Sequence, residues 1–287
     1  MTNKLALGTV QFGTVYGINN RTGRVPEGET AAILRRAYSA GVDMLDTAQA
    51  YGESEAVLGR ALQPDAKFRI VSKFTAGPDL TPKALFAESL ARLNARALYA
   101  FLSHKFSDLR DYPGWHKELL ELKAGGSLEK VGFSVYYPDE LRSLLDGGVK
   151  FDLVQLPYSV FDRRFEALLP ELKKLGVEVH ARSVFLQGVA FMKPSELPPG
   201  LAGIKEKLER LHAVSEKSGL PVSALCLCFG LLNDGIDRVV VGVDGLADLE
   251  GNLAGAARKD EVAKVSEELC LLREDDEEII LPFKWKK

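Results

Sequence analysis

The sequence predicts a single (β/α)8 TIM barrel, with the active site at the C-terminal face of its parallel strands. Two observations lead to this fold class. Short runs rich in Val, Ile and Leu recur along the 287 residues, and a segment with helical periodicity follows each run. An open doubly wound sheet would instead require a G-x-G-x-x-G turn after its first strand, where the chain reads G-T-V-Q-F-G.

Eight strands are expected, each apolar on both faces, as in a parallel sheet that helices cover. They are Leu5–Thr9, Val42–Thr47, Arg69–Lys73, Leu98–Ser103, Val131–Val135, Leu153–Pro157, Val177–Ser183 and Val239–Val243.

Helices are expected between these strands. Thr81 is the predicted N-cap of one helix with Pro82 at its first position, and Gly41 and Gly176 are predicted stop signals for two others. The expected helices are Glu29–Ala40, Glu53–Leu62, Pro82–Ala95, Gly114–Ala124, Pro138–Leu145, Arg164–Leu175, Ile204–Ser218, Val222–Leu232 and Leu246–Ala257.

Two long segments interrupt this alternation, Val10–Gly28 and Val184–Gly203, and long loops on the carboxyl face of a barrel usually carry function. Residues 1–287 are expected to form one domain, with 258–287 as a C-terminal helix and tail. The acidic run Glu274–Glu278 is expected to be a solvated surface segment.

Composition narrows the class of protein. Hydrophobic residues make up 46% and charged residues 27%, and the net charge of −3 makes nucleic acid and anionic membrane poor partners. No apolar run reaches the roughly 20 residues that span a bilayer, and no signal peptide is recognised. Cys226, Cys228 and Cys270 are expected to be reduced core thiols of a cytoplasmic protein, with no disulfide and no metal site.

Titratable side chains stand at or just beyond three neighbouring strand ends. Asp46 ends the second strand and Tyr51 follows it, Lys73 ends the third, and His104 follows the fourth. In a barrel these side chains share one mouth. A lysine held by a carboxylate is expected to lower the pKa of the tyrosine, which then donates a proton to an oxygen becoming an alkoxide. A histidine can orient that oxygen, so the set suits carbonyl reduction.

At this point the chain resembles the aldo-keto reductases. The resemblance is carried by L-G-T-x-x-F-G near the start, D-T-A-x-x-Y-G-E-S-E around Asp46 and Tyr51, and S-K at Lys73. It continues with His104, V-G-F-S, Q-x-x-Y and a late V-G-x-x-x-L-x-x-L-x-x-N, and so covers nearly the whole sequence. It implies that Tyr51 is the general acid-base, that Lys73 and Asp46 tune it, and that His104 orients the carbonyl.

The resemblance also implies a nicotinamide nucleotide cofactor. Its contacts would be Gly8, Thr9, Ser134, Gln155 and Arg182 at the nicotinamide, Ser183, Phe185, Gln187 and Gly188 at the pyrophosphate, and Gly242, Asp244, Asp248 and Asn252 at the adenosine.

The chain departs from the family pattern at four places in the site. Val135 replaces an asparagine, Arg182 replaces the aromatic residue that often stacks on nicotinamide, and Lys105 replaces a tryptophan. The adenosine end offers Asp244 and Asp248 rather than a lysine or arginine for a 2′-phosphate. The family favours NADP(H), so NADP(H) is the first expectation for the cofactor. The two carboxylates keep NAD(H) as an alternative.

The expected function is NAD(P)H-dependent reduction of a small-molecule aldehyde or ketone, sugar-like carbonyls included, by a monomer or weak homo-oligomer. Asn19, Asn20 and Arg21 of the first long loop could meet a polyol. Two alternatives remain open, a non-catalytic cofactor-binding protein or subunit with this barrel, and an aldolase that forms a Schiff base through Lys73. Trp115 and Trp285 could line a pocket, but packing is the first interpretation of both.

Overall fold

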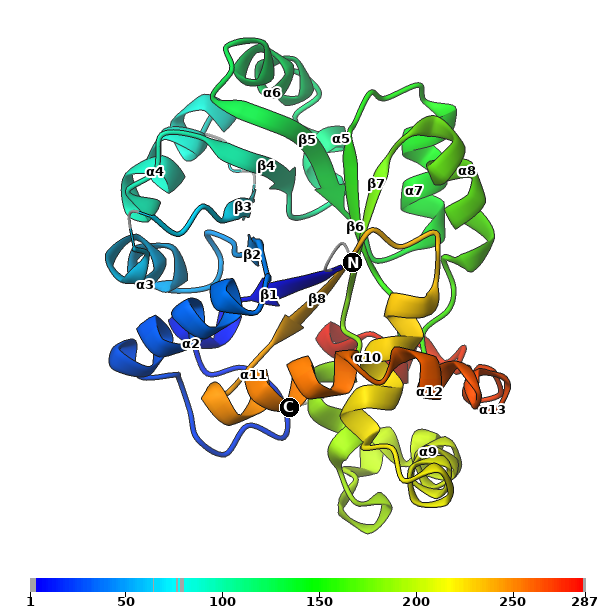
Figure 1. Cartoon of the computed structure of the whole chain (residues 1–287). Helices are drawn as coiled ribbons and strands as arrows, with labels where there is room; N and C mark the ends of the chain where they lie inside the picture. Colours follow the sequence, from blue (N-terminus) through cyan, green and yellow to red (C-terminus); the bar gives the residue numbers. More distant parts are fainter. Residues whose placement is uncertain (1–3, 64, 76, 78–79, 286–287) are drawn as a thin grey trace.

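The computed structural model describes residues 4–63, 65–75, 77 and 80–285. Its strands form a closed parallel barrel in chain order, in which β8 pairs with β1, so the predicted fold class is confirmed (Figure 1). The strands are β1 Leu5–Gly8, β2 Met44–Asp46, β3 Arg69–Phe74, β4 Leu98–Ser103, β5 Leu128–Ser134, β6 Leu153–Pro157, β7 Glu178–Arg182 and β8 Arg238–Gly242.

Helices surround the barrel, and Figure 1 shows them as an outer layer around the strands. Those that cover it are α2 Glu27–Ser39, α3 Ser54–Ala61, α4 Pro82–Leu93, α6 Trp115–Ala124, α7 Pro138–Asp146, α8 Leu169–Leu175, α10 Val222–Leu232 and α11 Leu246–Ala256. The remaining helices are α1 Val10–Gly13, α5 Ser107–Asp111, α9 Lys205–Ser218, α12 Lys259–Ala263, α13 Ser266–Cys270 and α14 Glu277–Ile280. Short 3-10 turns are η1 Glu166–Leu168, η2 Leu186–Phe191, η3 Pro194–Glu196, η4 Pro199–Ile204 and η5 Pro282–Lys284.

The two faces of each strand have different surroundings. Residues such as Leu7, Leu45 and Phe101 point outward and join the large core under the helices, whereas Met44 and Val71 belong to a smaller cluster inside the barrel. Because side chains alternate along a strand, each interior position is followed two residues later by another. This alternation carries Asp46, after Met44, and Lys73, after Val71, to the carboxyl end of the interior.

Several sequence expectations need correction. The helix expected over Arg164–Leu175 begins only at Leu169, after the η1 turn, because Pro170 fits the first turn of a helix but not its interior. Cys226 and Cys228 are buried as expected, whereas Cys270 is exposed. The acidic run is not wholly solvated, since Glu274 is buried and its Oε2 accepts a 2.8 Å bond from Lys207 Nζ.

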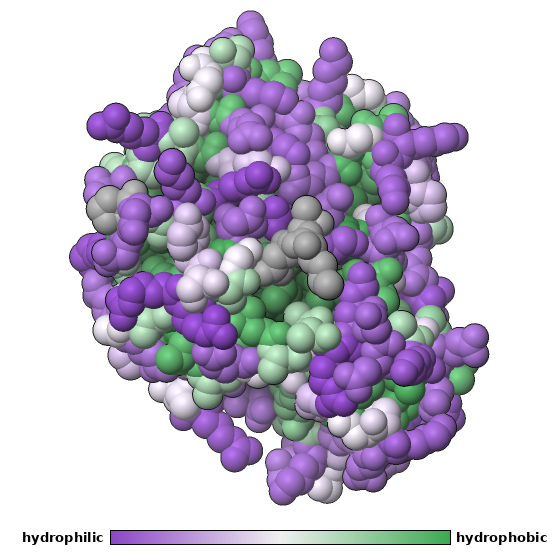
Figure 2. Space-filling model, in the orientation of Figure 1, coloured by the Kyte–Doolittle hydropathy of each residue, from purple (hydrophilic) through white to green (hydrophobic). Residues whose placement is uncertain are grey.

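The surface has a mixed character. Hydrophilic residues dominate the face seen in Figure 2, with apolar side chains in small groups between them. Within the part of the chain that the structure describes, none of the helices is both long enough and apolar enough to cross a membrane.

Candidate active site

A cavity of about 1100 Å³ opens at the carboxyl ends of the strands. Its wall is built from strand ends, from the loops after β1, β7 and β8, and from the C-terminal tail. The predicted site residues on this wall are Gly8, Thr9, Asp46, Tyr51, His104, Gln155, Arg182, Ser183, Phe185, Gln187, Gly188, Gly242, Asp244, Asp248 and Asn252. Lys73 and Ser134 are buried behind the wall rather than part of it.

Lys73 and Asp46 form a buried ion pair under the cavity. The Lys73 side chain has no exposed surface, and its Nζ donates to Asp46 Oδ1 at 2.7 Å and to the Thr47 carbonyl at 2.8 Å. The amide of Gln155 donates to the second Asp46 oxygen at 2.7 Å. Burial lowers the pKa of Lys73, and Asp46 opposes that shift. The ion pair therefore stabilises the Lys73 ammonium at a buried position where an unpaired ammonium would be strongly disfavoured.

Tyr51 lies above this pair. Its hydroxyl is 3.4 Å from Lys73 Nζ, and the ammonium is 4.9 Å from the centre of its ring. Two glycines let the loop that carries Tyr51 lie against α1. A Cβ on Gly13 would stand 1.8 Å from the Tyr51 carbonyl oxygen, and Gly52 has a φ of +57°.

His104 completes the group from the end of β4. Its backbone N–H donates to the Phe74 carbonyl at 2.8 Å, and its ring meets the Tyr51 ring edge-on with the centroids 5.7 Å apart. Burial, with the Lys73 charge as a smaller cause, lowers the pKa of His104 to about 3. The imidazole is therefore neutral at pH 7, with one N–H to donate. Asp46, Tyr51, Lys73 and His104 are called the strand-end cluster below.

The pKa of Tyr51 moves in the direction opposite to the sequence expectation. Burial raises it above its ordinary value and the Asp46 charge adds to this, while Arg182 opposes it. Burial and the Asp46 charge together outweigh the lowering of the Tyr51 pKa that was expected from Lys73. Tyr51 is thus a neutral phenol that holds its proton, and the lysine lies in place to stabilise a phenolate.

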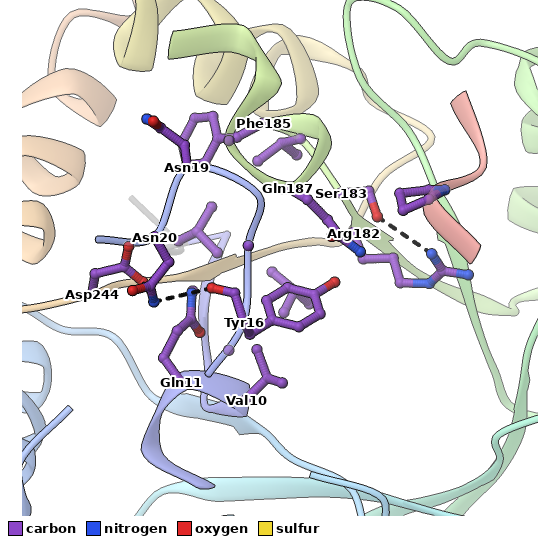
Figure 3. A pocket seen from close by; sticks show the side chains of 18 of the residues that line it. Val10, Gln11, Tyr16, Asn19, Asn20, Arg182, Ser183, Phe185, Gln187 and Asp244 are labelled. Carbon is purple, nitrogen blue, oxygen red and sulfur yellow. Dashed lines mark hydrogen bonds between the residues drawn. The ribbon is translucent and has the colours of Figure 1, made fainter. Parts of the chain in front are cut away.

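Arg182 extends from β7 to an unexpected partner. Its guanidinium carbon lies 4.1 Å from the centre of the Tyr136 ring, and it donates to the Val135 carbonyl at 3.1 Å and to Ser183 Oγ at 3.3 Å. In Figure 3 the guanidinium lies on the opposite side of the cavity from Asp244, with the Tyr16 ring between them.

The loop after β1 crosses the cavity and is tied on both sides. The Ile18 N–H donates to the Gln187 carbonyl at 3.0 Å on the β7 side. On the β8 side Asn20 Nδ2 donates to Asp244 Oδ1 at 3.1 Å, and Asn20 also bonds Tyr16 and Gly23. Asn20 therefore has a structural role that the polyol interpretation did not foresee.

Sequence reasoning missed part of the wall. Tyr16 and Tyr136 line the cavity, as do Phe283 and Trp285 of the tail, so the interpretation of Trp285 as a packing residue was incomplete. Phe283 meets Tyr136 edge-on at 4.9 Å. Tyr136 and Tyr137 follow the end of β5, and two successive aromatic residues at a strand end could have pointed to Tyr136. No local sequence pattern indicates that the C-terminal tail reaches the cavity.

Comparisons with known proteins identify the family of this chain. The sequence model described as "Aldo/keto reductase family" matches residues 4–268. The chain belongs to the aldo-keto reductase family. It is 26% identical over 285 residues to an L-galactose dehydrogenase of Arabidopsis thaliana, covering 92% of this chain and 88% of that protein.

Solved structures agree at the level of the fold. The aldo-keto reductase AKR11C1 from Bacillus halodurans, in its holo form, superposes with a TM-score of 0.71 at 20% identity. The match covers 96% of this chain and 95% of that one. As a member of the aldo-keto reductase family, this chain is an oxidoreductase.

Proposed function

We propose that this aldo-keto reductase reduces an aldehyde or ketone to the alcohol with NAD(P)H, and that Tyr51 supplies the proton. The observation that carries the proposal is the strand-end cluster, in which a neutral phenol, a buried lysine–aspartate pair and a neutral imidazole meet at a large cavity. Such clustering of perturbed titratable groups is typical of active sites.

Each side chain has a distinct task in this proposal. A bound nicotinamide would supply the hydride. Tyr51 gives its proton to the substrate oxygen as negative charge builds there. Lys73, 3.4 Å from the phenol oxygen, stabilises the phenolate that remains, and Asp46 keeps the ammonium in place. His104 donates its N–H to the same oxygen and fixes the direction of the carbonyl.

The rest of the cavity fits a dinucleotide. Gln11 Oε1 is buried on the wall without a hydrogen-bond partner within the described residues, and it faces the bare backbone of Gly242. Ser183, Gln187 and Gly188 have φ values of 62°, 52° and 97°, and such left-handed backbone is found mostly where a loop holds a ligand. These features support residues of the β7 and β8 loops as holders of the cofactor.

The charges favour NAD(H) over NADP(H), reversing the order that the family resemblance suggested. Within the described part of the chain, Arg182 is the only lysine or arginine on the cavity wall, and it lies opposite the β8 loop. That loop carries Asp244 and Asp248. Burial raises the pKa of Asp244 and the Asp248 charge adds to it. A 2′-phosphate beside these carboxylates would be repelled, whereas a free ribose hydroxyl could donate to them.

Sugar-like carbonyls are the proposed substrates, because the Arabidopsis relative is named an L-galactose dehydrogenase. The Schiff-base alternative is disfavoured, since Lys73 Nζ is buried and held by Asp46 and Thr47. Borohydride trapping should therefore give no covalent adduct.

The test is direct hydride transfer. Purified protein is incubated with a panel of aldehydes and ketones and with NADH or NADPH that carries deuterium at both C4 positions, and each alcohol is analysed by mass spectrometry. One deuteron on the carbinol carbon supports the proposal. Alcohol without deuterium, or no alcohol with either nucleotide, refutes it.

A further inference from the structure

Arg182 is a cation on the cavity wall. It is half-buried, and the described residues provide no carboxylate within 4.0 Å of it. Within the described residues its hydrogen bonds go to the neutral Val135 carbonyl and Ser183 hydroxyl, and these use two of the five N–H groups of an arginine. A partly desolvated guanidinium with free donors is suited to a carboxylate or phosphate.

The aromatic partner holds the guanidinium in one orientation. The guanidinium carbon lies over the Tyr136 ring, 4.1 Å from its centre, and Phe283 packs edge-on against that ring with the two ring centroids 4.9 Å apart. Because these contacts restrict the long side chain before a ligand arrives, less rotamer entropy is lost on binding. The arrangement is a preformed anion site on the aromatic side of the cavity.

Arg182 is also close enough to the strand-end cluster to affect it. Its positive charge lowers the pKa values of Tyr51 and His104, although burial is the main influence on both. The acidic β8 loop lies on the far side, beyond Tyr16 (Figure 3). The two sides of the cavity thus carry opposite charges. Carboxylates lie where the nucleotide ribose is proposed to bind, and a cation lies beside the proposed position of the substrate carbonyl.

We infer that the physiological substrate is an anionic carbonyl compound, whose carboxylate or phosphate group is held by Arg182 while its carbonyl lies between Tyr51 and His104. This inference rests on the proposed reductase function and narrows its substrate class. A carboxylate is the first expectation, because a planar two-oxygen group matches the free edge of a guanidinium supported on an aromatic ring.

The test compares substrates that differ in charge. Succinic semialdehyde is paired with its methyl ester, and glyceraldehyde 3-phosphate with glyceraldehyde, each with the preferred nucleotide at low ionic strength. Variants are Arg182→Gln, Arg182→Lys and, as a matched control, Arg35→Gln, which removes an equal charge from an exposed position off the cavity wall. A binding readout follows quenching of tryptophan fluorescence by succinate and by neutral succinamide, since Trp285 lines the cavity.

We expect the wild type to favour the charged member of at least one pair by tenfold or more in kcat/KM. The pair that shows the preference distinguishes carboxylate from phosphate. In Arg182→Gln the ratio should fall to about one and succinate quenching should be lost. Arg182→Lys should retain part of both, and Arg35→Gln should match the wild type.

Three results would separate the inference of an anionic substrate from the proposed reductase function. Equal use of both members of each pair by the wild type overturns the inference and leaves the reductase function standing. An unchanged ratio in Arg182→Gln with at least tenfold weaker NADH binding also overturns it, because Arg182 would then serve the nucleotide. Arg182-dependent succinate binding without reduction of any aldehyde refutes the reductase function and keeps the anion site.

Discussion

Replacing Lys73 by methionine tests the ion pair on which the strand-end cluster depends. The Lys73 and Asp46 side chains are 0% and 5% exposed, so the substitution leaves a buried carboxylate whose remaining side-chain partner is Gln155. Removing one member of a buried pair typically costs about 3–5 kcal/mol. For a chain of this size that corresponds to a fall in Tm of about 6–10 °C.

The assay is urea unfolding of Lys73→Met beside a matched control. Lys83 and Glu121 form an ion pair of similar length, 2.6 Å against 2.7 Å, but both side chains are about half exposed. Lys83→Met should therefore cost only about 0–1 kcal/mol. The double variant Asp46→Asn with Lys73→Met removes the stranded charge and should regain at least half of the loss. If Lys73→Met were as stable as Lys83→Met, the pair would not be buried as described.

Three further predictions concern other parts of the site. The folded-state pKa of His104, about 3, lies below its ordinary value, so its contribution to stability is complete above about pH 6.5 and is lost as pH falls toward 3. Its NMR signal, assigned with His104→Asn, should show no titration between pH 8 and 5, and an inflection near pH 6.5 would contradict its burial. Asp248→Arg should raise the NADPH-to-NADH affinity ratio about tenfold, roughly 1.4 kcal/mol, whereas Asp260→Arg, off the cavity wall, should not; equal ratios would remove Asp248 from the ribose site. Gly13→Ala should lower activity at least tenfold, because its Cβ would stand 1.8 Å from the Tyr51 carbonyl oxygen, while Gly28→Ala, with open space around it, should be silent in the same assay.

The sequence was sufficient for the barrel and for the positions of the interior strand-end residues. Parallel strands share one mouth, and side chains alternate along each strand, so Asp46 and Lys73 could be placed together from their spacing alone. Strand β4 was predicted to the residue, whereas β2 is three residues shorter than expected because Val42, Asp43 and Thr47 lie outside its regular pairing.

Contacts between distant segments were beyond local patterns. The tail reaches the cavity because Trp285 Nε1 donates to the Ile279 carbonyl at 2.9 Å and Phe283 packs on Tyr136, which no periodicity encodes. The direction of the Tyr51 shift was missed for a similar reason. The sequence shows that a lysine is near, but only the folded pocket shows that burial and Asp46 outweigh it.

Turnover and nucleotide binding in Tyr51→Phe test the central claim most directly. The phenol acts on the substrate oxygen in the transition state, so its removal should lower kcat by about 10²–10⁴-fold. The NADH dissociation constant, measured by fluorescence titration, should stay within about threefold of the wild type, because the ring that shapes the cavity remains. A Tyr51→Phe variant that keeps more than a tenth of wild-type kcat would contradict the account.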